Sequence, residues 1–208
     1  MAPHWIWQQP DWPDFRWQAE ALAPLLRECV QTQGQLLGMT GTVTASLSAQ
    51  NELDALLQNI VTSSAIEGEQ LNVGSVRSSL ARRLGLEQGD ETPVSQRSEG
   101  LANLLLDATR HFNQPLTVER LLEWHEWLFP DQTSDFAHRQ IRVGTLRGDE
   151  PMQVVSGRLD RPIVHFEAPP RQGLEQQGQT FVDWFDASRH QVSLDPLLRA
   201  GIAHFWFV

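Results

Sequence analysis

Three residues near the middle of the first half of the chain have a spacing that could present a carboxylate at the tip of a helix. Ser63 and Glu67 are four residues apart, so on a helix their side chains share one face. Gly68 follows directly, and glycine is the residue type that most often ends a helix. A carboxylate projecting at such an end could pair with a cation. The alternative is a solvated glutamate before a C-terminal glycine.

A short β-branched region in the second half predicts a hairpin. Gln153-Val154-Val155 and Ile163-Val164-His165-Phe166 are strand-like, and Ser156 to Asp160 separates them. We therefore expect a β-hairpin over Met152 to Phe166. His165 is interpreted as a strand histidine rather than a catalyst.

The elements that position these residues are mostly helices. Apolar residues recur at three- and four-residue spacing, and Asn72, Thr117 and Asp195-Pro196 are typical of helix starts. The predicted helices are 14–30, 48–66, 73–84, 94–112, 117–129, 174–185 and 195–208, and a further β-branched stretch is Ile141-Arg142-Val143. The fold class expected is mainly α with one small β-hairpin.

The two ends of the chain and its middle indicate how it is organised. The Trp- and Pro-rich start, 5–13, predicts an arm whose indole rings dock on the domain, and the alternative is an exposed aromatic patch. The polar segment Gly85 to Pro93 is the best linker, which predicts domains over 1–90 and 91–208. The last helix is apolar nearly all round, as core helices are. We expect the chain to stop within a domain, and the alternative is a natural end that fills a groove or contacts a dimer partner.

Composition excludes several classes of function. Sixteen basic residues, all of them Arg, against 26 acidic ones give a net charge of −10. Without Lys, a P-loop cannot contact phosphates in the usual way, and an acidic chain is a poor binder of nucleic acid. His125 and His138 have no metal-ligand spacing with carboxylates or cysteine, so no metal site is expected.

Targeting signals are not evident in the sequence. Cys29 is the only cysteine, so an internal disulfide is impossible, and a reducing compartment is the default. The start lacks a basic and then apolar signal region, and no apolar run approaches the ~18 residues of a membrane span. A cytoplasmic protein without a membrane partner is expected.

Several segments, in this order, resemble Fic-domain proteins that carry a Fic-associated N-terminal helical domain. The segments are Trp5-Ile6-Trp7, 62–69 (TSSAIEGE), 150–157 (EPMQVVSG), 164–170 (VHFEAPP) and 195–204 (DPLLRAGIAH). The resemblance implies a helical N-terminal domain with an inhibitory helix over 1–90. It implies the N-terminal part of a Fic core, incomplete at its C-terminus, over 91–208, with the hairpin as the family's flap.

The resemblance also implies an activity and its cofactors. Such proteins are adenylyltransferases that use ATP and Mg²⁺ to place AMP on a Ser, Thr or Tyr hydroxyl of a target protein, releasing pyrophosphate. Their signature, H-x-F-x-[DE]-G-N-G-R-x-x-R, is absent, since none of the seven histidines has Phe two residues later. The catalytic residues are expected beyond Val208, and this piece alone is expected to be inactive.

The resemblance to Fic-domain proteins also implies roles for two sets of residues, one inhibitory and one that docks the target. Ser63, Glu67 and Gly68 match the inhibitory motif [ST]-x-x-x-E-[GN], in which the Glu pairs with the second Arg of the signature and prevents productive binding of ATP. Met152, Gln153, Val154 and Val155 match the flap, whose strand edge aligns the target by main-chain pairing.

Two other functions remain open at this stage. The chain could be a naturally short, inactive Fic-like interaction module that forms a homodimer through Phe205 to Phe207, because bare apolar patches usually mark interfaces. A helix-turn-helix binder of nucleic acid is suggested only by the helical content, and the negative charge argues against it.

Overall fold

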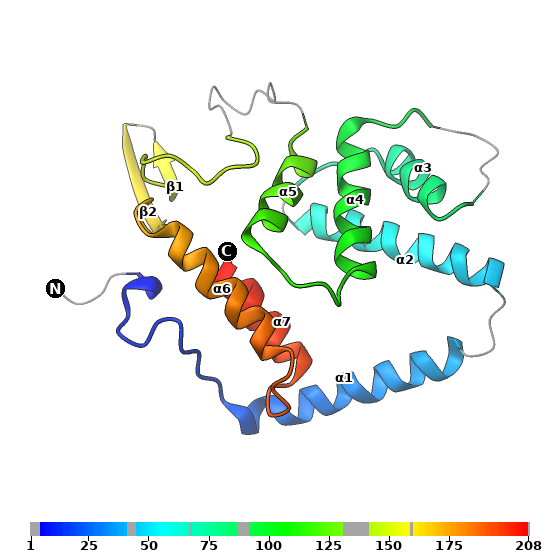
Figure 1. Cartoon of the computed structure of the whole chain (residues 1–208), viewed down its shortest axis with the longest axis horizontal. Helices are drawn as coiled ribbons and strands as arrows, with labels where there is room; N and C mark the ends of the chain where they lie inside the picture. The colour runs from blue at the N-terminus through cyan, green and yellow to red at the C-terminus, as the bar shows by residue number, and fades with distance from the viewer. Residues whose placement is uncertain are drawn as a thin grey trace. The chain divides into compact units, whose positions relative to one another are not determined.

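The structure is a computed structural model that describes residues 5–40, 45–66, 68–86, 92–130, 142–158 and 160–207. Within these residues the chain forms seven α-helices and one two-stranded antiparallel sheet (Figure 1). The elements in chain order are α1 (Ala19–Thr40), α2 (Ala45–Ile66), α3 (Val73–Arg83), α4 (Gln96–Arg110), α5 (Val118–Leu128), β1 (Gln153–Arg158), β2 (Arg161–Glu167), α6 (Leu174–Ser188) and α7 (Pro196–Phe207). The predicted fold class, mainly helical with one small hairpin, is confirmed.

Contacts between residues divide the chain into two units, each described by itself. The hairpin unit contains residues 1–34, 116–118 and 146–208, and the core unit contains residues 35–115 and 119–145. The predicted linker falls partly outside the described residues, at 87–91. The domain boundary near residue 90 therefore stays a prediction.

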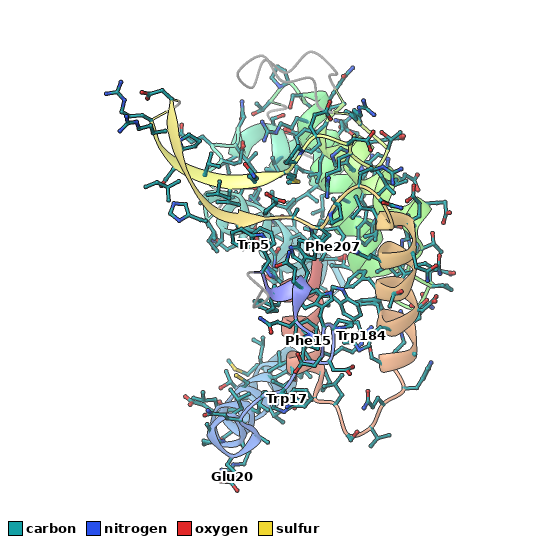
Figure 2. The ribbon with its side chains drawn as sticks, turned by 90° about the vertical axis from the view of Figure 1, so that its left-hand side faces the viewer. Trp5, Phe15, Trp17, Glu20, Trp184 and Phe207 are labelled. Carbon is teal, nitrogen blue, oxygen red and sulfur yellow. The ribbon has the colours of Figure 1, made fainter. Side chains whose placement is uncertain are left out.

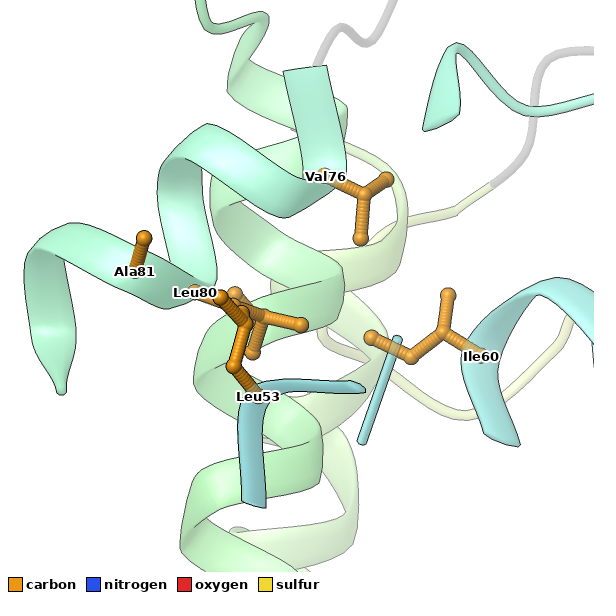
Figure 3. Packing of buried hydrophobic residues seen from close by; sticks show 6 residues of the cluster. Leu53, Ile60, Val76, Leu80 and Ala81 are labelled. Atoms are coloured by element: carbon orange, nitrogen blue, oxygen red, sulfur yellow. The ribbon is translucent and has the colours of Figure 1, made fainter. Parts of the chain in front are cut away.

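The core unit is built on an aliphatic cluster between α2, α3 and α4 (Figure 3). Leu53, Val76, Leu80 and Ala102 are at most 1% exposed. Burial of a Leu or Val side chain contributes about 1.5–3 kcal/mol, so these contacts dominate the stability of the unit. The predicted cap of α3 is confirmed, because the side chain of Asn72 accepts a hydrogen bond from the α3 backbone.

Buried serines join α3 to α4 within the same unit. The Ser75 hydroxyl donates to the Ser98 hydroxyl at 2.8 Å and accepts from the Ser95 backbone N–H at 3.0 Å. Ser95 caps α4, since its hydroxyl accepts from the Ser98 backbone N–H. These buried hydroxyls have partners, so they do not carry the cost of an unsatisfied polar group.

Helices α4 and α5 approach each other closely. A Cβ atom on Gly100 of α4 would overlap the carbonyl oxygen of Trp127 in α5. On the same helix pair, the Asp107 carboxylate accepts hydrogen bonds from Arg120 Nε and Trp124 Nε1, each at 2.8 Å. Partial burial acts to raise the pKa of Asp107, but hydrogen bonds from His111, Arg120 and Trp124 together lower it. Gly100 thus permits the close approach of α4 and α5, and the Asp107 carboxylate stabilises it through its hydrogen bonds.

The hairpin unit depends on aromatic contacts between the N-terminal arm and the last helix. Trp12 packs edge-on against Trp206 at 6.2 Å between ring centroids, and Phe15 packs against Phe205 at 5.7 Å. Arg199 of α7 donates to the Ser188 hydroxyl at the end of α6, and its guanidinium lies 4.1 Å from the centre of the Phe185 ring. The arm therefore docks on its own unit, as expected.

Three expectations about individual elements are wrong. The first helix begins at Ala19 rather than at residue 14, because Phe15 belongs to the docked arm instead of the helix. Arg142 and Val143 form an irregular segment and a turn rather than a strand, and Ile141 lies outside the described residues. Helix α7 has no buried residue among those described, with Phe205 52% and Phe207 63% exposed, so it is not a core helix here.

Candidate functional site

The C-terminal end of α2 forms a glycine-terminated motif. Gly68 has φ +76°, a left-handed conformation that suits glycine. Its N–H donates to the Ala65 carbonyl at 3.1 Å, and the Glu69 N–H donates to the Ser64 carbonyl at 2.8 Å. This pair of hydrogen bonds is the Schellman motif, which satisfies carbonyls that the end of a helix leaves free. The glycine stop expected from the sequence is confirmed.

The predicted inhibitory residues are only partly described. Ser63 is exposed on the last turn of α2, and Gly68 is exposed at its end, whereas Glu67 lies outside the described residues. The role of Glu67 therefore stays a prediction. The segment after the motif is anchored, because Glu69 Oε2 pairs with Arg97 of α4 at 2.6 Å.

The predicted flap is a real hairpin with a bulge. Strands β1 and β2 pair antiparallel, with Val154 opposite Phe166 and Val155 opposite Val164, so β2 has one extra residue between these pairs. Every described residue of β1 is exposed. Met152, Val154 and Val155 are 61%, 58% and 51% exposed, although all three are apolar. These side chains are thus presented to solvent, where another chain could contact them.

The base of the hairpin is fixed by the N-terminal arm. The Trp7 indole N–H donates to the Glu167 carbonyl at 2.7 Å. Trp5, which is labelled in Figure 2, packs edge-on against Phe166. The Ala168 N–H donates to the Met152 carbonyl at 2.9 Å, which extends the pairing beyond the strands. The arm therefore positions the exposed strands from one end.

The bulge brings together a pair that the sequence analysis did not anticipate. His165 Nε2 lies 2.6 Å from the Ser156 hydroxyl, across the hairpin. A nine-residue separation across a turn was visible in the sequence, but the extra residue that aligns the two side chains was not. Among the described residues no carboxylate hydrogen-bonds His165, so the pair lacks the third member of a hydrolase triad.

A partly exposed ion pair follows the hairpin at the first turn of α6. Two hydrogen bonds join Arg171 to the Glu175 carboxylate. These hydrogen bonds from Arg171 lower the pKa of Glu175 to about 2. Glu175 is therefore ionised at neutral pH and is unsuited to act as a general acid.

The described residues do not form a site for the cofactors that the resemblance implies. In the part of the chain that the structure covers, no three His, Cys, Asp or Glu side chains gather closely enough to hold a metal ion. The predicted site residues Ser63, Gly68 and 152–155 include no carboxylate that could ligate Mg²⁺.

Comparison with known proteins identifies one matching family. Residues 5–86 match the family described as "Domain of unknown function (DUF4172)". The matched segment contains α1, α2, α3 and the Ser63–Gly68 motif. No curated protein matches the chain significantly. No helix in the described ranges is long and apolar enough to cross a membrane.

Proposed function

We propose that this chain is the N-terminal, autoinhibitory portion of a Fic-type protein AMP transferase that acts in the cytoplasm. The activity moves AMP from ATP to a Ser, Thr or Tyr hydroxyl of a target protein. The observation that supports it most is the exposed hairpin in the position of the family's flap. Within the described residues its sheet has only two strands, so each strand has an unpaired edge.

The hairpin would align the target by adding a strand. An extended segment of the target pairs its main chain with the edge of β1, which provides affinity that does not depend on sequence. The exposed side chains of Val154 and Val155, which as successive strand residues point to opposite faces of the hairpin, then contact that segment on its two faces. In this arrangement Met152 to Val155 set the position of the hydroxyl and do not carry out the chemistry.

The end of α2 would act as the brake. The last turn of α2 is open, with Ser63 exposed and Ile66 79% exposed, which leaves room for an incoming arginine. Glu67 would bind the second Arg of the family signature with a charge-assisted hydrogen bond and so compete with the ATP γ-phosphate. The Schellman motif at Gly68 supports this role because it ends the helix at a defined residue.

ATP with Mg²⁺ supplies the AMP group, and the residues that hold both are proposed to lie beyond Val208. The residues of this chain contribute positioning and inhibition. The protein encoded by the complete reading frame is accordingly expected to contain H-x-F-x-[DE]-G-N-G-R-x-x-R.

The experiment compares transfer of radiolabelled AMP by that complete protein and two variants. Glu67→Gly should raise the rate by about 5–150-fold, the range for a coupling of ~1–3 kcal/mol. Glu69→Gln is the matched control, because it removes a charge two residues away and breaks only a partly exposed ion pair with Arg97. Its rate should equal that of the wild type.

Two results would count against the proposal at different levels. Equal rates for wild type and Glu67→Gly would reject Glu67 as the brake while leaving the transferase intact. A reading frame without the signature, together with no AMP transfer, would reject the transferase.

The exposed aromatic residues at the end of α7 favour a second candidate, an inactive interaction module that binds a second copy of itself. Phe205 and Phe207 are both more than half exposed, which is costly for a surface without a partner. Sedimentation of the chain at micromolar concentration distinguishes the two, because a module of this kind should sediment as a dimer. A monomer would exclude it.

A further inference from the structure

A small cavity lined by aromatic side chains lies within the hairpin unit. Its volume is about 230 Å³, and its lining includes Asp14, Phe15, Trp17, Trp184 and Trp206. Of these, Phe15, Trp17 and Trp184 are labelled in Figure 2. Every lining residue belongs to the hairpin unit, so the cavity is formed by one unit alone. The cavity is open to solvent, because Asp14 and Trp17 in its lining are exposed.

The rings around the cavity are inclined to one another. Trp184 and Trp206 have centroids 5.3 Å apart with 49° between their planes, and Phe15 and Trp206 are 6.0 Å apart at 53°. Trp17 is 43% exposed, and within the described residues its indole makes no ring contact and no hydrogen bond. One indole at the rim is therefore free to contact a ligand.

A carboxylate lines the same cavity without a cationic partner. Asp14 is exposed, and no basic side chain among the described residues pairs with it. Arg16, two residues away, pairs instead with Asp11 at 3.3 Å. The negative faces of the aromatic rings and this carboxylate both favour a positively charged ligand. The net charge of −10 adds to the same preference.

The size and lining select the kind of cation. The volume is below the ~300–1,000 Å³ of pockets for drug-sized ligands and equals that of roughly seven or eight water molecules. A primary ammonium or a guanidinium needs several hydrogen-bond acceptors, but Asp14 and Gln191 are the polar side chains among the lining residues. A quaternary ammonium has no N–H to satisfy and needs only aromatic faces and a nearby negative charge.

We propose that this cavity binds a quaternary ammonium group. The methyl groups pack against Trp17, Trp184 and Trp206, and the Asp14 carboxylate neutralises the charge. The group could belong to a small molecule such as choline or to a trimethylated lysine of a peptide. The experiment below separates these two sources.

Binding is measured by tryptophan fluorescence and calorimetry on the full chain. Choline should bind saturably, and its neutral carbon isostere, 3,3-dimethylbutan-1-ol, should bind at least tenfold more weakly because it has the same shape without the charge. A trimethyllysine peptide is compared with the same peptide unmethylated. Tighter binding of the methylated peptide than of choline assigns the group to a protein, and binding of choline alone assigns it to a small molecule.

Variants test the two parts of the site. Asp14→Asn keeps the shape and removes the charge, so choline affinity should fall at least fivefold. Trp17→Leu should have a similar effect, and since Trp17 is partly exposed the fold should survive, as circular dichroism can check. Asp183→Asn is the control, because Asp183 lies beside Trp184 in sequence and does not line the cavity. Equal affinity for choline and the alcohol, no binding of any ammonium, or unchanged affinity in Asp14→Asn would overturn the proposal.

Discussion

The core unit and the hairpin unit are each stabilised internally, and the side chains that do so differ between them. In the core unit, aliphatic and small residues such as Leu80, Ala102 and Gly100 allow helix backbones to approach closely, and the cluster is almost fully buried. In the hairpin unit, Phe15 and Trp206 join an irregular arm to a helix through a tilted ring contact, and both remain partly exposed.

The difference follows from side-chain size and shape. Small residues allow the backbones of neighbouring helices to approach closely, so the core unit can pack at high density. Large rings that meet edge to face bury a large area and favour particular angles between their planes. The core unit is therefore stabilised by aliphatic packing, whereas the hairpin unit is stabilised by ring contacts and has a cavity beside them.

The largest effect is expected from Gly100→Ala in the close-packed unit. The new Cβ atom would overlap a backbone oxygen of Trp127, so α4 and α5 must separate. Overpacking typically costs about 1–3 kcal/mol, and because the overlap is with backbone we expect at least the upper value. Urea unfolding followed by circular dichroism measures the loss.

The control for this substitution is Gly34→Ala in α1. Nothing lies within 4 Å of a Cβ at Gly34, so Ala should stabilise the helix by roughly 0.5–1 kcal/mol. Opposite signs for the two substitutions would support the close approach of α4 and α5. A stabilised Gly100→Ala protein would show that the two helices are farther apart than the structure indicates.

The same contrast explains which features the sequence could predict. The cap at Asn72 and the start of α7 at Pro196 were predictable, because each depends on residues within one turn. The hairpin was predictable from β-branched residues, but its strands extend through Ser156 to Arg158, which were expected to form the turn. Local patterns therefore predicted the presence of these elements better than their exact ends.

Contacts between residues distant in sequence were not predictable. Phe15 continues the apolar pattern of α1, yet it packs on Phe205, 190 positions later in the chain. The approach of Gly100 to Trp127 and the cavity beside Asp14 likewise arise from tertiary packing that overrides local pattern. The predicted flap residues are exposed as expected, whereas the position of Glu67 is not described.

An intermediate effect is expected from Asp107→Asn, which weakens the polar contact between α4 and α5. The charge that accepts hydrogen bonds from Arg120 and Trp124 is lost, and the side chains of Arg120 and Asp107 are only 15% and 20% exposed. We expect a cost of about 1–2 kcal/mol at pH 7. Asp54→Asn is the control in the same unit, because its ion pair with Arg77 is exposed and should be worth well under ~1 kcal/mol.

The pH dependence of stability provides a second measurement on Asp107. The pKa of Asp107 is lower in the folded state than the ordinary value of 3.8, so its contribution is present above that value and is lost as the pH falls through the folded pKa. The wild type should therefore lose more stability than Asp107→Asn as the pH falls below about 4. Parallel curves for the two proteins would show that the carboxylate does not stabilise the contact.

The smallest effect is expected in the aromatic unit, from Phe15→Leu. Leucine keeps most of the volume but removes the ring contacts with Trp12, Phe205 and Trp206, each of which joins arm residues to one another or to α7. We expect the arm to open about 1 kcal/mol more easily, which is roughly a fivefold larger open population. Trypsin cleavage after Arg16, whose side chain is 83% exposed, should accelerate by the same factor, because cleavage follows the open population when opening is fast.

Phe112→Leu is the control, because it changes an exposed ring in the core unit and should leave the rate of cleavage after Arg16 unchanged. An equal cleavage rate for Phe15→Leu and the wild type would mean that the Phe15 ring does not hold the arm. The aromatic contacts that distinguish the hairpin unit from the core unit would then be those of the tryptophan rings alone.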